Sequence, residues 1–287
     1  MEIPGIFRVT DPVGPPAPLL LGVPHAGRAY PGDFKFSCAP ELLRQTEDSY
    51  VDELVTDATR HGATVLTALF PRAMVDVNRA LSDLDPAVVD GVWPEPLQPS
   101  VRTLQGLGLI RRLCKGGVPM YDGPLPLAEI DQRLRQFYHP YHRALAAQIT
   151  ALQRRFDEVW LIDCHSMPSA GFENAGAGKR ADFVLGDRDG TTCDPEFTAL
   201  AARLLRDLGY SVAVNDPYKG VEILQRYGQP ARRQHALQLE INRALYLDEA
   251  TCARTAGFDR LRADLESFSN RIVAALSRRH EARSAAE

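Results

Sequence analysis

The stretch VWLIDCHSMPS, residues 159–169, joins an apolar run to a group of reactive side chains. A short apolar run of this kind is typical of a buried strand in an α/β sheet, and Pro168 marks its end. Before that proline come four side chains that can each take part in chemistry: Asp163, Cys164, His165 and Ser166. This strand therefore indicates the fold and carries a candidate site.

Strand geometry narrows these four candidates. Side chains on a strand point alternately to opposite faces, so Cys164 and His165 should not pair directly. Ser166 lacks the GxSxG turn that presents an activated serine. Metal ligation is therefore the leading chemical role for His165, and a structural histidine at a strand end is the alternative. The role of Asp163 stays open, with orientation of a metal ligand as one candidate.

Other short apolar runs alternate with longer helical patterns along the chain. Strands are predicted over residues 19–23, 63–70, 74–77, 159–164, 183–186, 211–214 and 237–241. Helices are predicted over residues 40–60, 127–156, 194–208 and 258–279, and Pro140 is expected to kink or divide the second. The alternation predicts a layered α/β fold around a largely buried, mixed or parallel sheet. A chain of 287 residues fits one domain, although its length permits two.

A second predicted strand also ends in a histidine. The run LLLGV, residues 19–23, leads through Pro24 into His25. Ligands of α/β sheets bind beyond the carboxyl ends of strands, so the two histidines can converge there. Asp48, early in the first predicted helix with Glu47 beside it, is the candidate third ligand, and a solvated helix face is the alternative. Two histidines and a carboxylate form a catalytic zinc pattern with an open fourth position.

The segment QLEINR, residues 238–243, predicts a strand with one polar face. Gln238, Glu240 and Asn242 point to one side, whereas the leucine and isoleucine between them point to the other. Such a face lines either a site or a wet edge. If it lines the site, Glu240 is the natural general base for a metal-bound water.

The segment PRAMVDVNR, residues 71–79, places two arginines around a predicted strand. Arg72 and Arg79, with Asn78 adjacent, suit the recognition of an anionic ligand, because a guanidinium group binds a carboxylate through two hydrogen bonds. The alternative, which the sequence supports equally, is ion pairing with nearby carboxylates: Asp76, Asp83 and Asp85.

Two further features bear on the site. His139 and His142 lie three residues apart on a predicted helix and form a competing metal pair, although Pro140 disturbs the register that would align them. The stretch 83–123 is irregular and rich in proline and glycine. Long irregular stretches inside compact domains often carry function, so we expect this one to cover or line the site.

Composition narrows the class of partner. A formal net charge of −4 argues against nucleic-acid binding, which depends on clustered lysine and arginine. No apolar run approaches the roughly 20 residues of a membrane-spanning helix. The first residues, MEIPGIFRVTDPVG, show no basic start followed by an apolar region, so we expect a cytoplasmic protein. The five cysteines form no CxxC pair, which argues against a disulfide framework and a thiolate zinc site.

Taken together, these segments resemble the N-formylglutamate amidohydrolase family. The matching segments follow the family order and span most of the chain: VPHAGRAYPGDF (23–34), EDSYVDEL (47–54), PRAMVDVNRALSDLD (71–85), LIDCHSMPS (161–169), ADFVLGDRDGTTC (181–193), NDPYKG (215–220), RYGQP (226–230) and QLEINRALYLDE (238–249). The resemblance implies a single catalytic domain over residues 1–287. It also implies a three-layer α/β/α sandwich with a central mixed sheet, similar to zinc carboxypeptidases.

The resemblance further implies one catalytic zinc ion (Zn²⁺) and a reaction. The reaction is hydrolysis of N-formyl-L-glutamate to formate and L-glutamate, the last step of one histidine-degradation route. By position, Glu240 matches the general base, and the family's metal ligands match three residues: His25, Asp48 and His165. The segment expected to dock the substrate carboxylates contributes Arg72, Asn78 and Arg79. The choice of Asp48 over Glu47 rests on the alignment of the motif.

Two other functions fit the same residues. One is a related metal-dependent hydrolase that acts on other N-acyl amino acids or peptides. The other is a non-catalytic carboxylate-binding protein on the same fold, against which Glu240 argues, because binding needs no general base. The expected partner is a small anionic N-formyl amino acid substrate.

Overall fold

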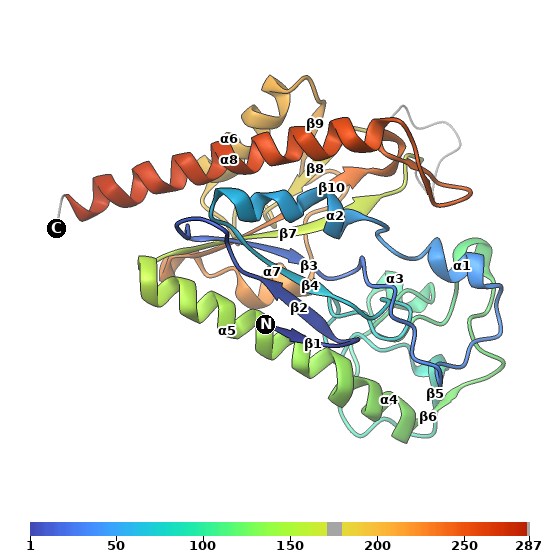
Figure 1. The fold of residues 1–287 in the computed structure, drawn as a ribbon. Coiled ribbons are helices and arrows are strands. Elements are labelled where there is room, and N and C mark those ends of the chain that lie inside the picture. Colours follow the sequence, from blue (N-terminus) through green and yellow to red (C-terminus); the bar gives the residue numbers. More distant parts are fainter. Residues whose placement is uncertain (171–179, 286–287) are drawn as a thin grey trace.

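The protein is described by a computed structural model that covers residues 1–170 and 180–285. Within these residues one mixed sheet holds eight strands, in the order β1 (Glu2–Ile3), β2 (Phe7–Thr10), β4 (Thr64–Ala68), β3 (Leu19–Val23), β7 (Val159–Met167), β10 (Gln234–Asn242), β8 (Phe183–Gly186) and β9 (Val212–Val214). The four inner strands β4, β3, β7 and β10 run parallel, whereas β2 and β8 run antiparallel to their inner neighbours. The predicted α/β fold with a mixed sheet is confirmed (Figure 1).

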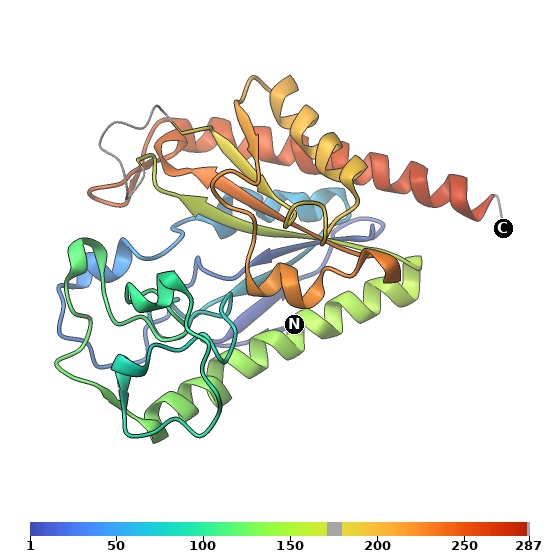
Figure 2. The ribbon, with the colours of Figure 1, turned by 180° about the vertical axis from the view of Figure 1, so that it is seen from behind.

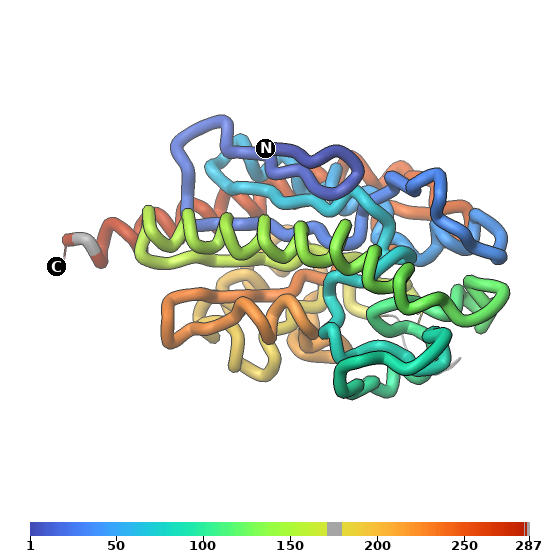
Figure 3. Tube along the Cα trace, turned by 90° about the horizontal axis from the view of Figure 1, so that it is seen from below, coloured from blue at the N-terminus to red at the C-terminus, as the bar shows by residue number. Residues whose placement is uncertain are grey.

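Helices cover both faces of this sheet (Figures 1 and 3). One face carries α2 (Val51–Val55), α6 (Pro195–Asp207) and α8 (Gly257–Ser284), and both α2 and α6 contact α8. The other face carries α4 (Leu127–Arg133), α5 (His139–Phe156) and α7 (Glu222–Tyr227), with α5 packed on β3, β4 and β7 and α7 packed on β10. Each face has its own apolar core, so the described residues form a three-layer α/β/α sandwich.

The remaining elements are short. They are α1 (Pro40–Arg44), α3 (Val101–Leu104), the 3-10 helices Thr56–His61, Pro86–Val88, Lys115–Gly117, Pro230–Arg232 and Arg243–Leu245, and two strand pairs, β5 (Val89–Asp90) with β6 (Leu125–Pro126) and β11 (Leu247–Asp248) with β12 (Ala253–Arg254). Segments α1, α3, β5 and β6 gather at the end of the sheet where the parallel strands finish (Figures 1 and 2). The irregular stretch 83–123 therefore lies at that end, as expected.

Strand alternation on β7 is confirmed. Ile162 and Cys164 belong to the core beneath α2, α6 and α8, whereas Leu161 belongs to the core on the α5 side. Asp163 and His165 share the face of Leu161 because the side-chain period of a strand is two. The helix pattern around Pro140 is also divided as predicted: a π-helical turn, Leu134–Tyr138, separates α4 from α5.

Two local predictions are wrong. Residues 74–77 form turns instead of a strand, because Asp76 accepts the Asn78 backbone N–H on its own side chain (2.9 Å) and donates its N–H to Leu109 (2.8 Å), outside any strand ladder. The helix expected over residues 40–60 is broken between Arg44 and Val51, where Tyr50 takes a left-handed conformation (φ 65°). Asp48 therefore lies in a turn and not early in a helix.

None of the helices in the described part of the chain combines the length and the apolarity needed to cross a bilayer.

Candidate active site

His25 is positioned by the end of β3 and by a close backbone approach. The strand ends at Val23. Gly27 then lies against the backbone that follows β4, so closely that an added Cβ would be 2.1 Å from the carbonyl oxygen of Phe70. Only glycine fits there. The His25 side chain is 1% exposed, and its Nε2 lies 2.7 Å from Oδ1 of Asp76.

His165 is positioned by β7 and by its neighbour two residues earlier. Oδ2 of Asp163 lies 2.7 Å from Nε2 of His165, on the shared face of the strand. Both side chains are buried. Each of the two histidines therefore has a buried carboxylate on Nε2, which orients the ring and leaves Nδ1 as the atom that faces the centre.

Asp48 reaches the same centre from the turn between α1 and α2. Its backbone N–H donates to the His25 carbonyl (3.0 Å), which ties the turn to the end of β3. Arg243, just after β10, holds the turn from the other side: it donates to Oδ1 of Asp48 (3.0 Å), to the Glu47 carbonyl (2.7 Å) and to Oγ of Ser166 (2.9 Å). The Glu47 side chain faces elsewhere and accepts from the Tyr30 hydroxyl (2.7 Å).

Three ligand-type atoms converge at this point. Nδ1 of His25 lies 3.1 Å from Nδ1 of His165, and Oδ2 of Asp48 lies 3.4 Å and 3.2 Å from these two nitrogens. Ligand atoms at the usual zinc distances stand about 3.3 Å apart on a tetrahedron. Two imidazole lone pairs this close to a carboxylate oxygen repel one another unless a cation lies between them. The buried group His25, Asp48 and His165 therefore fits a metal ion.

The charges around this group shift its pKa values. Burial alone would lower the pKa of His165, but Asp163 and Asp48 raise it well above its ordinary value. Burial would raise the pKa of Asp48, but hydrogen bonds from His165 and His25 and the charge of Arg72 hold it well below its ordinary value. The shift of His165 reflects the carboxylates beside it, whereas the shift of Asp48 reflects donors and a positive charge that stabilise its ionised form, the form that binds a cation.

Glu240 lies beside this group on β10. Its Cα is the register partner of the His165 Cα in the parallel β7–β10 pair. Burial, with the charge of Asp48, raises the pKa of Glu240 to about 7, although His165 and Arg72 oppose this. Gln238 donates to Oε1 of Glu240 (2.9 Å), as expected for two residues on one strand face, and Oε2 has no hydrogen-bond partner among the described residues. A carboxyl group in this state is suited to take up and release a proton near neutral pH.

The arginine segment also reaches the site. Arg72 donates to Oδ2 of Asp76 (2.6 Å) and lies 3.6 Å from Oδ1 of Asp48. Arg79 pairs more distantly with Asp83 (3.9 Å), and its Nε is buried without a hydrogen-bond partner. Asn78 donates to Oδ2 of Asp163 (3.4 Å) and accepts the Ile223 N–H (2.9 Å).

Comparisons with known proteins agree with this geometry. The family model described as N-formylglutamate amidohydrolase matches residues 17–247. The chain belongs to the N-formylglutamate amidohydrolase family. It is 34% identical over 239 residues to N-formylglutamate deformylase of Pseudomonas aeruginosa, covering 81% of this chain and 83% of that protein. It is 32% identical to N-formylglutamate deformylase of Pseudomonas putida, covering 81% of this chain and 82% of that one.

A solved member of the family has the same fold. The crystal structure of N-formylglutamate amidohydrolase from Ralstonia eutropha JMP134 matches with a TM-score of 0.92 and 44% sequence identity, covering 96% of this chain and 99% of that chain. This protein is therefore a hydrolase of the N-formylglutamate amidohydrolase family.

Three residues close to the His25, Asp48 and His165 group are not indicated by the sequence pattern: Asp76, Arg111 and Arg243. Asp76 was considered only as an ion-pair partner for arginine, and Arg243 only as the last letter of a motif. Arg111 lies in the irregular stretch 83–123. All three act from turns or loops, where periodicity carries no information. The only signal in the sequence is the type of residue; in the structure Asp76 is buried, whereas Arg111 and Arg243 are half-buried.

The competing histidine pair does not form a metal site. His142 instead contacts the Tyr227 hydroxyl (2.9 Å) and the Val77 carbonyl (3.0 Å), and burial lowers its pKa to about 3.

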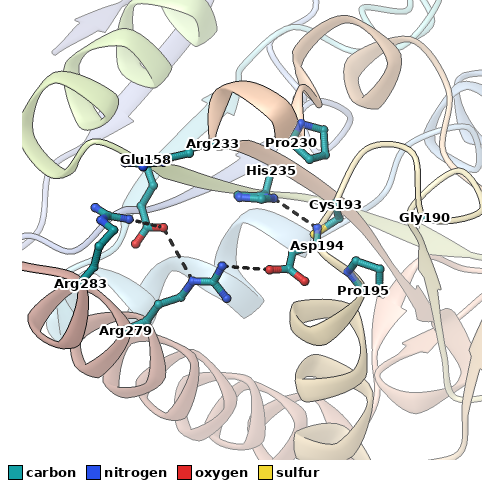
Figure 4. A pocket seen from close by; sticks show the side chains of 10 residues that line it. All are labelled: Glu158, Gly190, Cys193, Asp194, Pro195, Pro230, Arg233, His235, Arg279 and Arg283. Atoms are coloured by element: carbon teal, nitrogen blue, oxygen red, sulfur yellow. Dashed lines mark hydrogen bonds and ion pairs between the residues drawn. The ribbon is translucent and has the colours of Figure 1, made fainter. Parts of the chain in front are cut away.

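A cavity of about 460 Å³ lies at the other end of the central strands, away from the amidohydrolase site (Figure 4). Four of its charged groups form two ion pairs: Arg279 with Asp194 (3.0 Å) and Arg283 with Glu158 (2.9 Å). His235 stacks on Trp160, with ring centroids 3.8 Å apart. These contacts anchor α8 to the sheet.

Proposed function

We propose that this protein is a zinc-dependent N-formyl-L-glutamate deformylase that releases formate and L-glutamate. The observation that carries the proposal is the convergence of His25 Nδ1, His165 Nδ1 and Asp48 Oδ2 beside a buried glutamate, in a member of the N-formylglutamate amidohydrolase family. The relatives from both Pseudomonas species carry the name of this activity. By resemblance to the family, the reaction ends one route of histidine degradation in the cytoplasm.

The chain itself would hold the zinc through His25, Asp48 and His165. Bound there, zinc polarises a carbonyl group and lowers the pKa of a water molecule toward about 7. Asp76 and Asp163 keep the Nε2 proton on each histidine, so that both Nδ1 lone pairs face the centre.

Glu240 is the general base in this proposal. Its Oε2 takes a proton from the attacking water as the water oxygen bonds to the formyl carbon. The same carboxyl then gives that proton to the amide nitrogen as the carbon–nitrogen bond breaks. The second proton of the water also passes to this nitrogen, so the products are formate and the ammonium form of glutamate, and atoms and charge balance. The nearly neutral pKa of Glu240 suits both transfers.

The substrate carboxylates would dock among Arg72, Asn78 and Arg79. Arg72 lies closest to the metal group, because it approaches Asp48 (3.6 Å). The α-carboxylate of the substrate is also close to the scissile amide, so it belongs beside Arg72. Arginine held by neighbouring carboxylates is pre-organised for such binding.

The test is amide hydrolysis, measured as release of the free amino acid, by zinc-loaded protein on four substrates: N-formyl-L-glutamate, N-formyl-L-aspartate, N-acetyl-L-glutamate and N-formyl-L-methionine. The proposal expects the highest kcat/KM for N-formyl-L-glutamate and loss of activity after chelation, restored by zinc. A higher kcat/KM for another substrate would favour a related amidohydrolase. Tight binding of N-formyl-L-glutamate without turnover, in protein that holds no metal and gains none, would favour a carboxylate-binding protein.

A further inference from the structure

Arg111 is brought to the active site by the irregular stretch 83–123. Two backbone hydrogen bonds fasten the neighbouring Leu109 to the segment that carries Arg79: the Asp76 N–H donates to the Leu109 carbonyl (2.8 Å), and the Leu109 N–H donates to the Asp83 carbonyl (2.8 Å). Leu109 itself is fully buried. Arg111 is therefore held on a fixed support, in a position that no strand or helix pattern indicates.

The guanidinium group of Arg111 has no anionic partner in the described part of the chain. Arg72 is neutralised by Asp76 (2.6 Å), and Arg79 has Asp83 at 3.9 Å. Arg111 forms no ion pair with any described residue, and its Nε is buried without a hydrogen-bond partner. A buried donor without a partner costs free energy, so this arrangement calls for a ligand that accepts the hydrogen bond.

The surroundings of Arg111 add a second reason. Burial and the positive charges of Arg72 and Arg79 lower the pKa of Arg111 to about 9, although Asp76 and Asp48 oppose this. Of these three arginines, Arg72 and Arg79 each have a carboxylate within 4 Å, whereas Arg111 pairs with none among the described residues. A ligand with two carboxylates supplies the missing partner, with one group beside Arg72 and the other beside Arg111.

We propose that Arg111 is a specificity-determining residue that binds the side-chain carboxylate of an acidic N-formyl amino acid. The inference rests on the proposed function and deepens it. Arg72 contacts the Asp48 region, so it suits the α-carboxylate near the scissile bond. Arg111 has no such contact and comes from a separate segment, so it suits the carboxylate at the far end of the substrate.

The test compares two substrates of equal length, N-formyl-L-glutamate and N-formyl-L-glutamine, in the zinc-loaded wild type and Arg111→Gln. We expect Arg111→Gln to lower kcat/KM for N-formyl-L-glutamate about 100-fold, mainly through KM, because a site built for a charged group loses its partner. Its kcat/KM for N-formyl-L-glutamine should change less than about 3-fold. Arg111→Lys should recover only part of the loss, because lysine lacks the planar fork.

The matched control is Arg112→Gln. Arg112 is the next residue but pairs with Asp85 (2.8 Å), so its loss should leave the ratio of the two kcat/KM values unchanged. Calorimetric titration of chelator-treated protein with L-glutamate and L-glutamine gives a readout independent of turnover, and the wild-type preference for glutamate should vanish in Arg111→Gln.

Three outcomes would overturn the inference. An unchanged kcat/KM for both substrates would remove Arg111 from the site. An equal loss of kcat/KM for both substrates, with a normal melting temperature, would mean that Arg111 does not distinguish a carboxylate from an amide. A wild type that hydrolyses neither substrate would overturn the proposed function itself, whereas the first two outcomes leave that function standing.

Discussion

Asp163 and His165 lie two residues apart on one face of β7, and Oδ2 of Asp163 is 2.7 Å from Nε2 of His165. The same relationship occurs between Asp76 and His25, also at 2.7 Å, although these two residues are 51 positions apart in the chain. One carboxylate is placed by strand periodicity and the other by a turn. Both fix a ring so that Nδ1 faces Asp48, which pre-organises a group of three residues that could hold a metal ion.

Asp163→Asn should weaken zinc binding without unfolding the protein. The amide keeps the shape of the side chain but removes the negative charge that makes the histidine a better donor. We expect a loss of about 10- to 100-fold in zinc affinity, measured by competition with a chelating dye. Asp131→Asn, at an exposed carboxylate paired with Arg135, is the matched control and should bind zinc like the wild type. Equal affinity in both variants would refute the orienting role of Asp163.

Glu240→Gln should separate metal binding from catalysis. Glutamine has the same shape but cannot accept the proton of the attacking water. We expect kcat for N-formyl-L-glutamate to fall about 1,000-fold while the zinc content stays at the wild-type level. Formate release and metal analysis on the same preparation provide both measurements. Full activity in a zinc-loaded variant would remove Glu240 from the role of general base.

The sequence predicted the parts of the site that depend on strand geometry. His25 and His165 could be placed at strand ends, and Glu240 on the polar face of its strand, because apolar runs and period-two alternation carry that information. Asp76 and Arg243 could not be placed, since each acts across a long chain separation from a turn. Asp48 could be predicted from its motif. The turn that carries it could not, because the helical pattern continues through Tyr50 in the sequence.

The fold was predictable for the same physical reason. The central strands β7 and β10 are buried on both faces: β7 begins with a continuous apolar run, whereas β10 alternates polar and apolar residues. The segment at 74–77 has a similar apolar character, but its backbone is satisfied by turns and by Leu109. Its apolar residues alone therefore led to the prediction of a strand. Only the partner of each backbone N–H distinguishes the two cases.

Arg243→Lys should loosen the turn that carries Asp48. The arginine fork joins the Asp48 carboxylate, the Glu47 carbonyl and Ser166, and a lysine can satisfy only part of this set. We expect a loss of about 2 kcal/mol in the free energy of unfolding, measured with urea, and weaker zinc binding. Arg254→Lys is the control, because Arg254 pairs with Glu53 at the surface. A wild-type free energy of unfolding and wild-type zinc binding in Arg243→Lys would show that the turn does not depend on Arg243.

Gly27→Ala should damage the His25 loop through a backbone clash. The added Cβ would lie 2.1 Å from the Phe70 carbonyl oxygen, so the loop or the end of β4 must move. We expect a loss of about 3 kcal/mol in the free energy of unfolding, together with reduced zinc affinity. Gly32→Ala is a matched control in the same loop, since its Cβ would meet nothing within 4 Å. Similar stability of the two variants would contradict the close approach.

His142 should make the protein less stable as the pH falls from about 6.5 toward 3. Burial lowers the pKa of folded His142 to about 3, so below pH 6.5 the unfolded chain takes up a proton that the folded chain refuses. His142→Gln removes this difference. The stability advantage of the wild type over His142→Gln should shrink by about 1.4 kcal/mol between pH 7.5 and pH 5.5. Urea unfolding with a chelator present measures it, because metal binding then adds nothing to the free energy of unfolding of either protein. A constant advantage across this range would mean that folded His142 binds its proton as readily as the unfolded chain does.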